Sequence, residues 1–364
     1  MKNKKSARRK NPTRRGWIAT AGAALATAPI KARAAEKLRL TLACWDYDRT
    51  RALMDGRIQV DGVDLTYLNL PVEETFFRML RNSEFDACEM SLSSYVVSLF
   101  EANPRFTAIP VFPSRYFRHS CIYINASAGI RQPAGLIGKK VGTPEYQMTA
   151  PVWIRGILAD EYKVPVSSVT YYTGGEEETG RSEKLALTLP PAIKVEQIGP
   201  TQTLSKMLES GEIDALHTAR APSTFYSNPN RVKRLFPDYA RLEREYYAKT
   251  KIFPIMHTVI IRRDVYEKYP WVAQSLYKGF VQSQRITYAD LHETAALKSM
   301  LPWLPEHVEE AEKTMGRDFW AYGYDPNVAN LSTFLRYSFE QGLSQRLLSP
   351  RDLFAKESLE AFKI

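Results

Sequence analysis

Short apolar runs alternate with helical patterns along this 364-residue chain, and this alternation constrains its fold more than any other feature. Residues 38–44, 63–70 and 87–90 have the composition of buried strands, whereas residues 74–82 and 93–101 have helical patterns. Strands separated by helices build parallel sheets, because each crossover helix covers a face of the sheet. The chain is therefore predicted to be an α/β protein.

The pattern breaks near residues 110–113 and then starts again, which predicts a second α/β lobe. From residue 265 onward the chain is mostly helical, and these helices are expected to cover the first sheet. A chain of this length usually exceeds what one hydrophobic core can serve. We therefore expect lobe 1 to contain residues 35–112 and 265–364, and lobe 2 to contain residues 113–264.

One pattern occurs in both predicted lobes at an offset of 128 residues, as MLRNSEFDACE at residues 79–89 and MLESGEIDALH at residues 207–217. Each copy reads as a helix end, a polar turn and a buried strand, which ends at the sheet edge where α/β proteins bind ligands. A structural repeat would place Glu89 and His217 at equivalent positions, facing a shared cleft. Convergence of two unrelated helix-turn-strand units is the alternative.

The formal charge of +10 comes from residues 1–34, which hold ten basic side chains and no acidic one. The rest of the chain carries 40 basic and 40 acidic side chains. A neutral body offers no electrostatic basis for binding nucleic acid, which depends on many cationic contacts to phosphates. We therefore expect no nucleic-acid partner.

Residues 1–34 have the order of an export signal and resemble the twin-arginine type. Arg14 and Arg15 precede an apolar run at residues 19–30, and small residues surround Ala34. The run is too short to span a bilayer, and no later run is long enough. We expect cleavage near Ala34 and a periplasmic or otherwise extracytoplasmic mature protein. A basic tail on a cytosolic protein is the alternative.

The three cysteines, Cys44, Cys88 and Cys121, lack the CxxC spacing of a zinc or redox site. Each lies in or beside a predicted strand, so we expect three buried side chains that act as small hydrophobes. A bridge between Cys44 and Cys88 is the alternative that an oxidising compartment would allow.

Six motifs carry a family resemblance that runs through nearly the whole mature chain. They are WDYDRT at 45–50, FRHS at 117–120, GTPEY at 142–146, GEIDA at 211–215, FPIMHT at 253–258 and YGYDPN at 322–327. Together they resemble the 4,5-dihydroxyphthalate decarboxylase family, and the two lobes resemble the type II periplasmic-binding-protein fold. The resemblance implies an interlobe ligand cleft and the loss of carbon dioxide from a dihydroxylated aromatic dicarboxylate.

Decarboxylation of a hydroxylated benzoate requires cations that hold its carboxylates. Arg49, Arg118 and Arg220 follow or border strand ends that should face the cleft. The planar guanidinium fork of arginine suits a carboxylate, although a solvated surface position is the alternative for each of the three. The turn before a predicted helix at residue 150 should also place backbone N–H groups toward an anion.

The same chemistry requires groups that move protons to and from the ring. The candidates for this role are His119, His217, His257 and Glu89. Asp46 and Glu145 are expected behind them in the ligand site, and Trp45 and Tyr146, with Tyr47, could stack on an aromatic ring. A satisfied histidine on a strand is the alternative for His119 and His257.

No HExxH motif or paired ligand spacing predicts a metal, so we expect no cofactor; a divalent ion would have to be assembled from distant segments. Two functions remain open. One is decarboxylation of a hydroxylated aromatic carboxylate such as 4,5-dihydroxyphthalate. The alternative, favoured by export, is an extracytoplasmic solute-binding protein that delivers an organic anion to an ABC-type permease.

Overall fold

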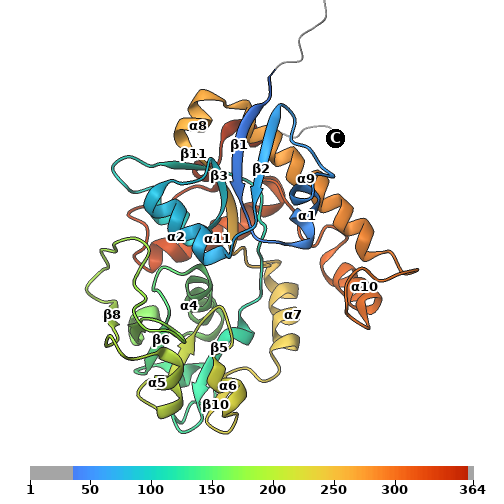
Figure 1. Cartoon of the computed structure of the whole chain (residues 1–364). Coiled ribbons are helices and arrows are strands. Elements are labelled where there is room, and N and C mark those ends of the chain that lie inside the picture. Colours follow the sequence, from blue (N-terminus) through green and yellow to red (C-terminus); the bar gives the residue numbers. More distant parts are fainter. Residues whose placement is uncertain (1–35, 360–364) are drawn as a thin grey trace, which may run out of the picture. The chain divides into compact units, whose positions relative to one another are not determined.

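The computed structural model describes residues 36–359 (Figure 1). The predicted export signal and its cleavage point lie outside the described residues. From Lys37 onward the described residues form one compact unit, which contains two separate β-sheets with helices around them.

The first sheet contains five strands in the order β2-β1-β3-β11-β4. Strand β1 runs parallel to β2 and β3, whereas β11 runs antiparallel to β3 and β4. The strands are β1 (Leu38–Ala43), β2 (Val63–Leu68), β3 (Ala87–Ser91), β4 (Phe106–Ile109) and β11 (His257–Arg262). The helices that accompany this sheet are α1 (Asp48–Met54), α2 (Val72–Asn82), α3 (Leu92–Ser98), α8 (Arg263–Lys268) and α9 (Trp271–Leu291). Helix α10 (Leu304–Met315) contacts α9 and α7 (Tyr239–Thr250), and α11 (Val328–Glu340) contacts α4 (Thr149–Tyr162).

The second sheet contains six strands in the order β10-β5-β9-β6-β7-β8, in which β6, β7, β8 and β9 are parallel. The strands are β5 (Ile122–Asn125), β6 (Lys140–Thr143), β7 (Thr170–Thr173), β8 (Lys194–Gln197), β9 (Ala215–His217) and β10 (Val232–Arg234). The accompanying helices are α4 (Thr149–Tyr162), α5 (Leu204–Ser210), α6 (Ser223–Ser227) and α7 (Tyr239–Thr250).

Strand β11 lies in the first sheet and not in lobe 2, to which the sequence prediction assigned it. The prediction assigned residues up to 264 to lobe 2, but β11 pairs with β3 and β4 in the first sheet. The chain therefore returns to lobe 1 before its helical cover begins. The physical reason is that β11 has neighbours on both sides within a sheet interior, where Val259, Ile260 and Ile261 are fully buried.

The repeated pattern folds into the same local structure in both lobes. Helices α2 and α5 both end at a left-handed residue, Ser83 and Gly211, which are 128 positions apart in the pattern. Asp86 accepts the backbone N–H of Thr41 on β1, and its counterpart Asp214 accepts the backbone N–H of Lys140 on β6. Both copies therefore form the helix end, turn and strand that the pattern predicts.

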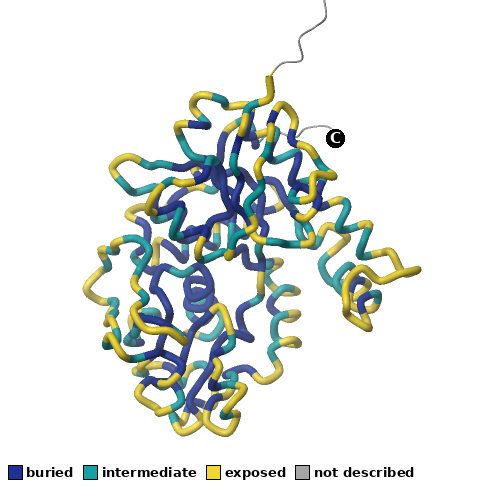
Figure 2. Tube along the Cα trace, in the orientation of Figure 1, coloured by how far each residue is buried: buried dark blue, intermediate teal, exposed yellow. Residues whose placement is uncertain are grey.

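Buried residues follow both sheets and helix α4 (Figure 2). Helix α4 belongs to the second sheet but also contacts α3 and α11, and Trp153 on it donates a hydrogen bond to the carbonyl oxygen of Ile255 at 2.8 Å. The three cysteines are buried and free, as predicted. Within residues 36–359, none of the helices combines the length and apolar character needed to cross a membrane.

Candidate active site

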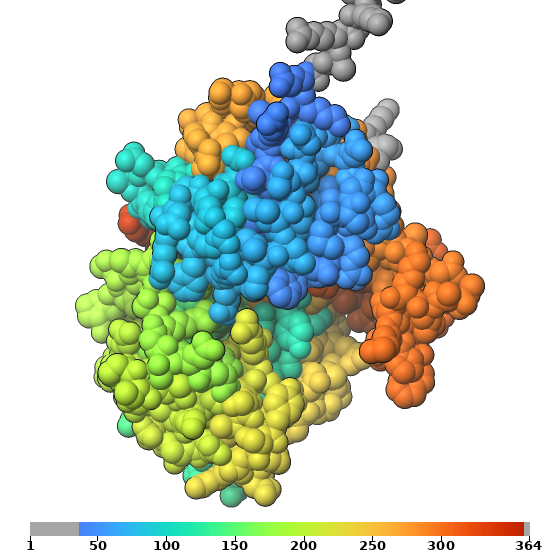
Figure 3. All heavy atoms as spheres, in the orientation of Figure 1, coloured from blue at the N-terminus to red at the C-terminus, as the bar shows by residue number. Residues whose placement is uncertain are grey.

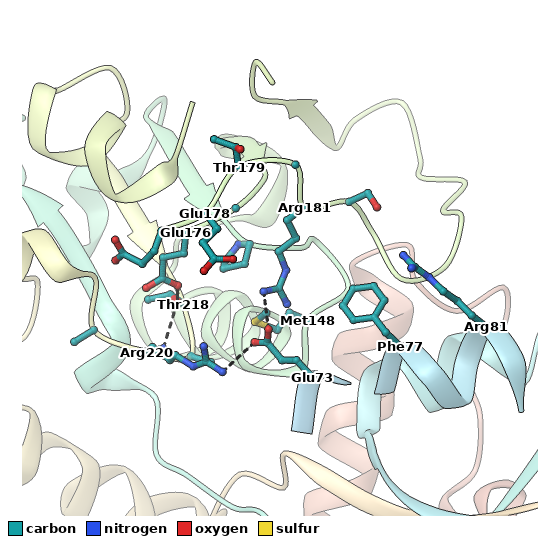
Figure 4. A pocket seen from close by; sticks show the side chains of 17 residues that line it. Glu73, Phe77, Arg81, Met148, Glu176, Glu178, Thr179, Arg181, Thr218 and Arg220 are labelled. Atoms are coloured by element: carbon teal, nitrogen blue, oxygen red, sulfur yellow. Dashed lines mark hydrogen bonds and ion pairs between the residues drawn. The ribbon is translucent and has the colours of Figure 1, made fainter. Parts of the chain in front are cut away.

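The candidate site is a cleft with two neighbouring compartments, and residues of both lobes line it. The inner compartment has a volume of about 140 Å³ and the outer one about 470 Å³. Both are lined by Glu73, Met148, Arg181, Ala219 and Arg220, so the two compartments are direct neighbours. Figure 4 shows the residues that line the outer one. Figure 3 shows a face on which blue lobe 1 residues meet green and yellow lobe 2 residues.

His257 lines the inner compartment and is held by a buried carboxylate. Its Nδ1 lies 2.6 Å from Oε1 of Glu89, which is fully buried on β3. In the antiparallel register His257 is opposite Ser91 and Val259 is opposite Glu89, so both side chains project from the same face of the sheet. Because Nδ1 is engaged, Nε2 is the ring nitrogen left for a ligand.

Glu89 is surrounded by hydrogen-bond donors. The Tyr47 hydroxyl donates to Oε1 at 2.6 Å, and the Trp45 backbone N–H donates to Oε2 at 3.2 Å. Burial alone would raise the pKa of Glu89, but the adjacent His257 and these hydrogen bonds outweigh burial and lower the pKa. Burial and the Glu89 charge raise the pKa of Tyr47, so its hydroxyl keeps its proton. Glu89 is therefore an anion that fixes the orientation of His257.

Arg118 supplies a buried cation to the inner compartment. Its guanidinium contacts the Met256 sulfur at 3.1 Å, the Cys121 sulfur at 3.5 Å and the Ala219 carbonyl oxygen at 3.4 Å. It is only 7% exposed and forms no ion pair with any carboxylate among the described residues. A buried, unpaired guanidinium facing a cavity is suited to bind an anion.

A network of ion pairs crosses the cleft. Glu73 on α2 pairs with Arg181 at 3.0 Å and with Arg220 at 3.3 Å, both from the second sheet's loops. Arg181 also pairs with buried Glu145 at 2.6 Å, and Lys184 contacts the same carboxylate. These pairs place three further cations around the cleft and link the two lobes across it.

Hydroxyl groups and a helix end complete the inner compartment. Ser91 and Thr149 both line it, and their side-chain oxygens lie 2.9 Å apart. Thr149 and Ala150 are the first residues of α4, so the positive end of this 14-residue helix faces the compartment. The predicted seat for an anion at a helix start is present, but the helix begins at Thr149 and not directly after the GTPE turn.

Comparison with known proteins identifies the family. A 4,5-dihydroxyphthalate decarboxylase from Comamonas testosteroni is 43% identical to this chain over 328 residues, which cover 90% of this chain and 99% of that protein. This chain belongs to the 4,5-dihydroxyphthalate decarboxylase family. A 4,5-dihydroxyphthalate decarboxylase from Pseudomonas putida is 46% identical over 211 residues, which cover 58% of this chain and 82% of that protein. No family model matches the sequence.

The fold of this decarboxylase family member is also found among transport proteins. A solved structure described as a periplasmic sulfonate-binding protein from Methylobacillus flagellatus is 12% identical, with a TM-score of 0.51, and covers 88% of this chain and 92% of that protein. At this identity the likeness concerns the fold alone. It confirms the predicted periplasmic-binding-protein fold.

His217 does not face Glu89, so this predicted pair is wrong. His217 is 1% exposed, and neither ring nitrogen has a hydrogen-bond partner among the described residues. Burial, with a smaller effect of Arg155, lowers the pKa of His217 to about 3, so the ring is neutral. The repeat places His217 in the core of the second sheet, whereas the next residues, Thr218 to Arg220, reach the cleft.

His119 is also a core residue. Its ring packs against Phe236 and Tyr246, with ring centroids 5.4 Å away in both cases, and burial lowers its pKa to about 4. It does not line either compartment. Of the four predicted proton-transfer residues, the structure brings together Glu89 and His257.

The residues of the WDYDRT motif do not line the cleft, but some of them hold residues that do or that support them. The Trp45 side chain is 40% exposed, and its backbone N–H holds Glu89. Asp46 pairs with Arg51 on the surface at 3.0 Å. Arg49 donates to the Pro113 carbonyl oxygen at 2.6 Å and lies over the Tyr47 ring, so it supports the residue that donates to Glu89.

Tyr146 and Glu145 lie behind the cleft. Tyr146 is fully buried, donates its hydroxyl to the Gln341 carbonyl oxygen at 3.1 Å and packs under Arg155. It is a core residue and not a stacking platform for a ligand. Glu145 does not line either compartment but holds Arg181 and Lys184, which do. Among the predicted cations, Arg118 and Arg220 line the cleft.

Sequence reasoning missed Glu73, Arg181, Lys184 and Glu176. The last three lie in or after a loop rich in glycine and glutamate, GGEEETG at residues 174–180, and this composition is the one signal that could have pointed to them. Within the described part of the chain, no group of three or more His, Cys, Asp or Glu side chains is arranged to hold a metal ion.

Proposed function

We propose that this protein decarboxylates 4,5-dihydroxyphthalate in the cleft and releases carbon dioxide and 3,4-dihydroxybenzoate. Two relatives that are named for this activity, one of them matched over 99% of its length, support the assignment. The two carboxyl groups of this substrate are equivalent by symmetry, so loss of either gives the same product.

One observation carries the proposal: Arg118 and His257 line the same inner compartment. Arg118 would anchor a substrate carboxylate, together with the start of helix α4 and the hydroxyl groups of Ser91 and Thr149. The other carboxylate would then lie near Arg181 and the remaining cations of the cleft.

His257 would deliver a proton to the ring carbon that loses its carboxylate. The Glu89 contact orients Nε2 toward the compartment and stabilises the positive charge of the imidazolium before the transfer. Tyr47 and the Trp45 backbone N–H keep Glu89 ionised and in place. The acid, its orienting carboxylate and the carboxylate anchor would all be side chains of this chain, so we propose a reaction without a cofactor.

The test is turnover by purified protein with 4,5-dihydroxyphthalate, followed by chromatography of 3,4-dihydroxybenzoate and by carbon dioxide release, with and without a chelator. His257→Gln should lower kcat by roughly 10²- to 10⁴-fold, the usual range for a lost general acid. The matched control is His292→Gln, because His292 is an exposed surface residue that pairs with Glu312 at 3.1 Å. Equal activity in both variants would refute the role of His257.

The solute-binding alternative rests on the fold and on the predicted export signal. It predicts that the protein binds the dicarboxylate without converting it. Stoichiometric binding with no product after prolonged incubation would favour that alternative over our proposal.

A further inference from the structure

Charge changes along the cleft. The inner compartment is lined by four cations, Arg118, Arg181, Lys184 and Arg220, and by one carboxylate, Glu73. The residues that line the outer compartment alone include Arg81 and the three carboxylates Glu176, Glu177 and Glu178. The outer compartment shares Glu73, Arg181 and Arg220 with the inner one, so four carboxylates and three cations line it in all. An anion is therefore held more strongly in the inner compartment than in the outer one.

This gradient orients the substrate of the proposed function. The two carboxylates of 4,5-dihydroxyphthalate lie at one end of the ring and the two hydroxyl groups at the other. The carboxylates would enter the cationic inner compartment, so the hydroxyl groups would face outward, toward the carboxylate-rich wall.

Glu176 is the carboxylate of this wall that is placed to receive a hydroxyl proton. It is partly buried, and its Oε2 accepts a hydrogen bond from the Thr218 hydroxyl (Figure 4). It forms no ion pair among the described residues. Glu73 is instead paired with two arginines, and Glu177 is turned to Ser223, whose backbone N–H it accepts at 2.6 Å.

We propose that Glu176 is a second catalytic residue, which accepts the proton of the substrate hydroxyl para to the departing carboxylate. This inference rests on the proposed function and adds the base that the reaction requires opposite the acid His257. The acid His257 lines the inner compartment and the base Glu176 lines the outer one, so they would act at opposite ends of the substrate ring.

The proton and electron changes balance without an external reagent other than water. The hydroxyl proton moves to Glu176, and the resulting phenolate pushes electron density to the para carbon. That carbon takes the proton from Nε2 of His257, and its bond to the carboxylate then breaks. The bond's electron pair restores the aromatic ring as carbon dioxide leaves. Glu176 returns its proton to the phenolate oxygen, and His257 regains one from water.

The surroundings of Glu176 suit this role. Burial raises its pKa to about 7, and Glu177 also raises it, while the Thr218 hydrogen bond and the charges of Arg220 and Arg181 act in the opposite direction. A carboxylate with this pKa is a stronger base than an exposed glutamate and is still ionised in part at neutral pH.

Glu176→Gln is the first test. We expect kcat to fall by roughly 10²- to 10⁴-fold with little change in KM, and the residual rate to rise with pH as solvent ionises the hydroxyl instead. The control is Glu212→Gln, which removes an exposed carboxylate that contacts Gln202 and Ser210 on the surface of lobe 2. A kcat of Glu176→Gln equal to that of the control would overturn the inference.

A second test does not depend on turnover. In a His257→Gln background, titration calorimetry would compare 4,5-dihydroxyphthalate with phthalate, which lacks both hydroxyl groups. Adding Glu176→Ala should weaken the first ligand by about tenfold or more, because a charge-assisted hydrogen bond is lost, and should leave phthalate affinity unchanged. Equal weakening of both ligands would overturn the inference. Absence of product from the wild type would refute the proposed function instead, and the ligand pair would still locate the hydroxyl contact.

Discussion

Glu89→Gln provides a sharp test of the proposed acid, His257. The substitution keeps the shape of the side chain but changes which nitrogen of the His257 ring carries a proton. The side chain of Glu89 receives the Trp45 backbone N–H on one oxygen, and the Tyr47 hydroxyl and the His257 ring on the other. A backbone N–H can only donate. The glutamine oxygen must therefore face Trp45, and its amide NH₂ must face Tyr47 and His257.

This arrangement changes the tautomer of His257. The NH₂ group donates to Nδ1, so Nδ1 loses its proton and Nε2 carries the proton of the neutral ring. The amide NH₂ then faces Nδ1 where the wild type has a carboxylate, so it destabilises the imidazolium form of the ring. If the neutral ring delivered the proton instead, it would be left as an imidazolate. By analogy with other enzymes in which a carboxylate orients a catalytic histidine, we expect a loss in kcat of about 10³- to 10⁴-fold.

The cost in folding free energy should be smaller than this loss of activity suggests. Tyr47 can rotate its hydroxyl to accept, and His257 can accept at Nδ1, so few buried groups lose a partner. We expect the free energy of unfolding to fall by about 1–3 kcal/mol, the cost of one imperfect buried hydrogen bond and a lost charge. Urea unfolding, kcat and the ¹⁵N shifts of the His257 ring would be measured together. A folded variant with kcat within threefold of wild type, or with Nδ1 still protonated, would refute the reasoning.

Three further predictions concern the anion site and the chain terminus. Arg118→Ala should weaken phthalate binding by about 1.5–3 kcal/mol, measured by titration calorimetry, because a charge-assisted contact is lost; unchanged affinity would make Arg118 structural. Glu73→Gln should strengthen phthalate binding severalfold by releasing two arginines that it now pairs, whereas Glu74→Gln, on the same helix and paired on the surface, should not change it. Replacing Arg14 and Arg15 with lysine should leave the protein in the cytoplasm on fractionation, and continued export would contradict the twin-arginine prediction.

Sequence patterns determined the fold class and the repeated unit because both depend on neighbouring residues. Apolar runs separated by helical periods predict an α/β fold wherever they occur, and the helix end, turn and strand of the repeat form in both lobes from the same local residues. The family motifs likewise lie within short segments. Buried cysteines followed from their place in apolar strands, and they are buried and free.

The partner of Glu89 was decided by the tertiary structure alone. The repeat made His217 its counterpart, yet each strand of the repeat is buried in its own sheet, so the two residues do not meet. Strand β11 instead returns to the first sheet and brings His257 against a residue 168 positions earlier.

The charges of the cleft were decided in the same way. Glu73 and Arg181 are 108 positions apart and meet only because the second sheet's loop folds over α2. No periodicity within either segment encodes that contact, since hydrophobic patterns specify which face of an element is buried but not which distant element covers it. The sequence alone therefore determined the elements and the candidate chemistry, whereas long-range packing decided which cations, acids and bases share one cavity.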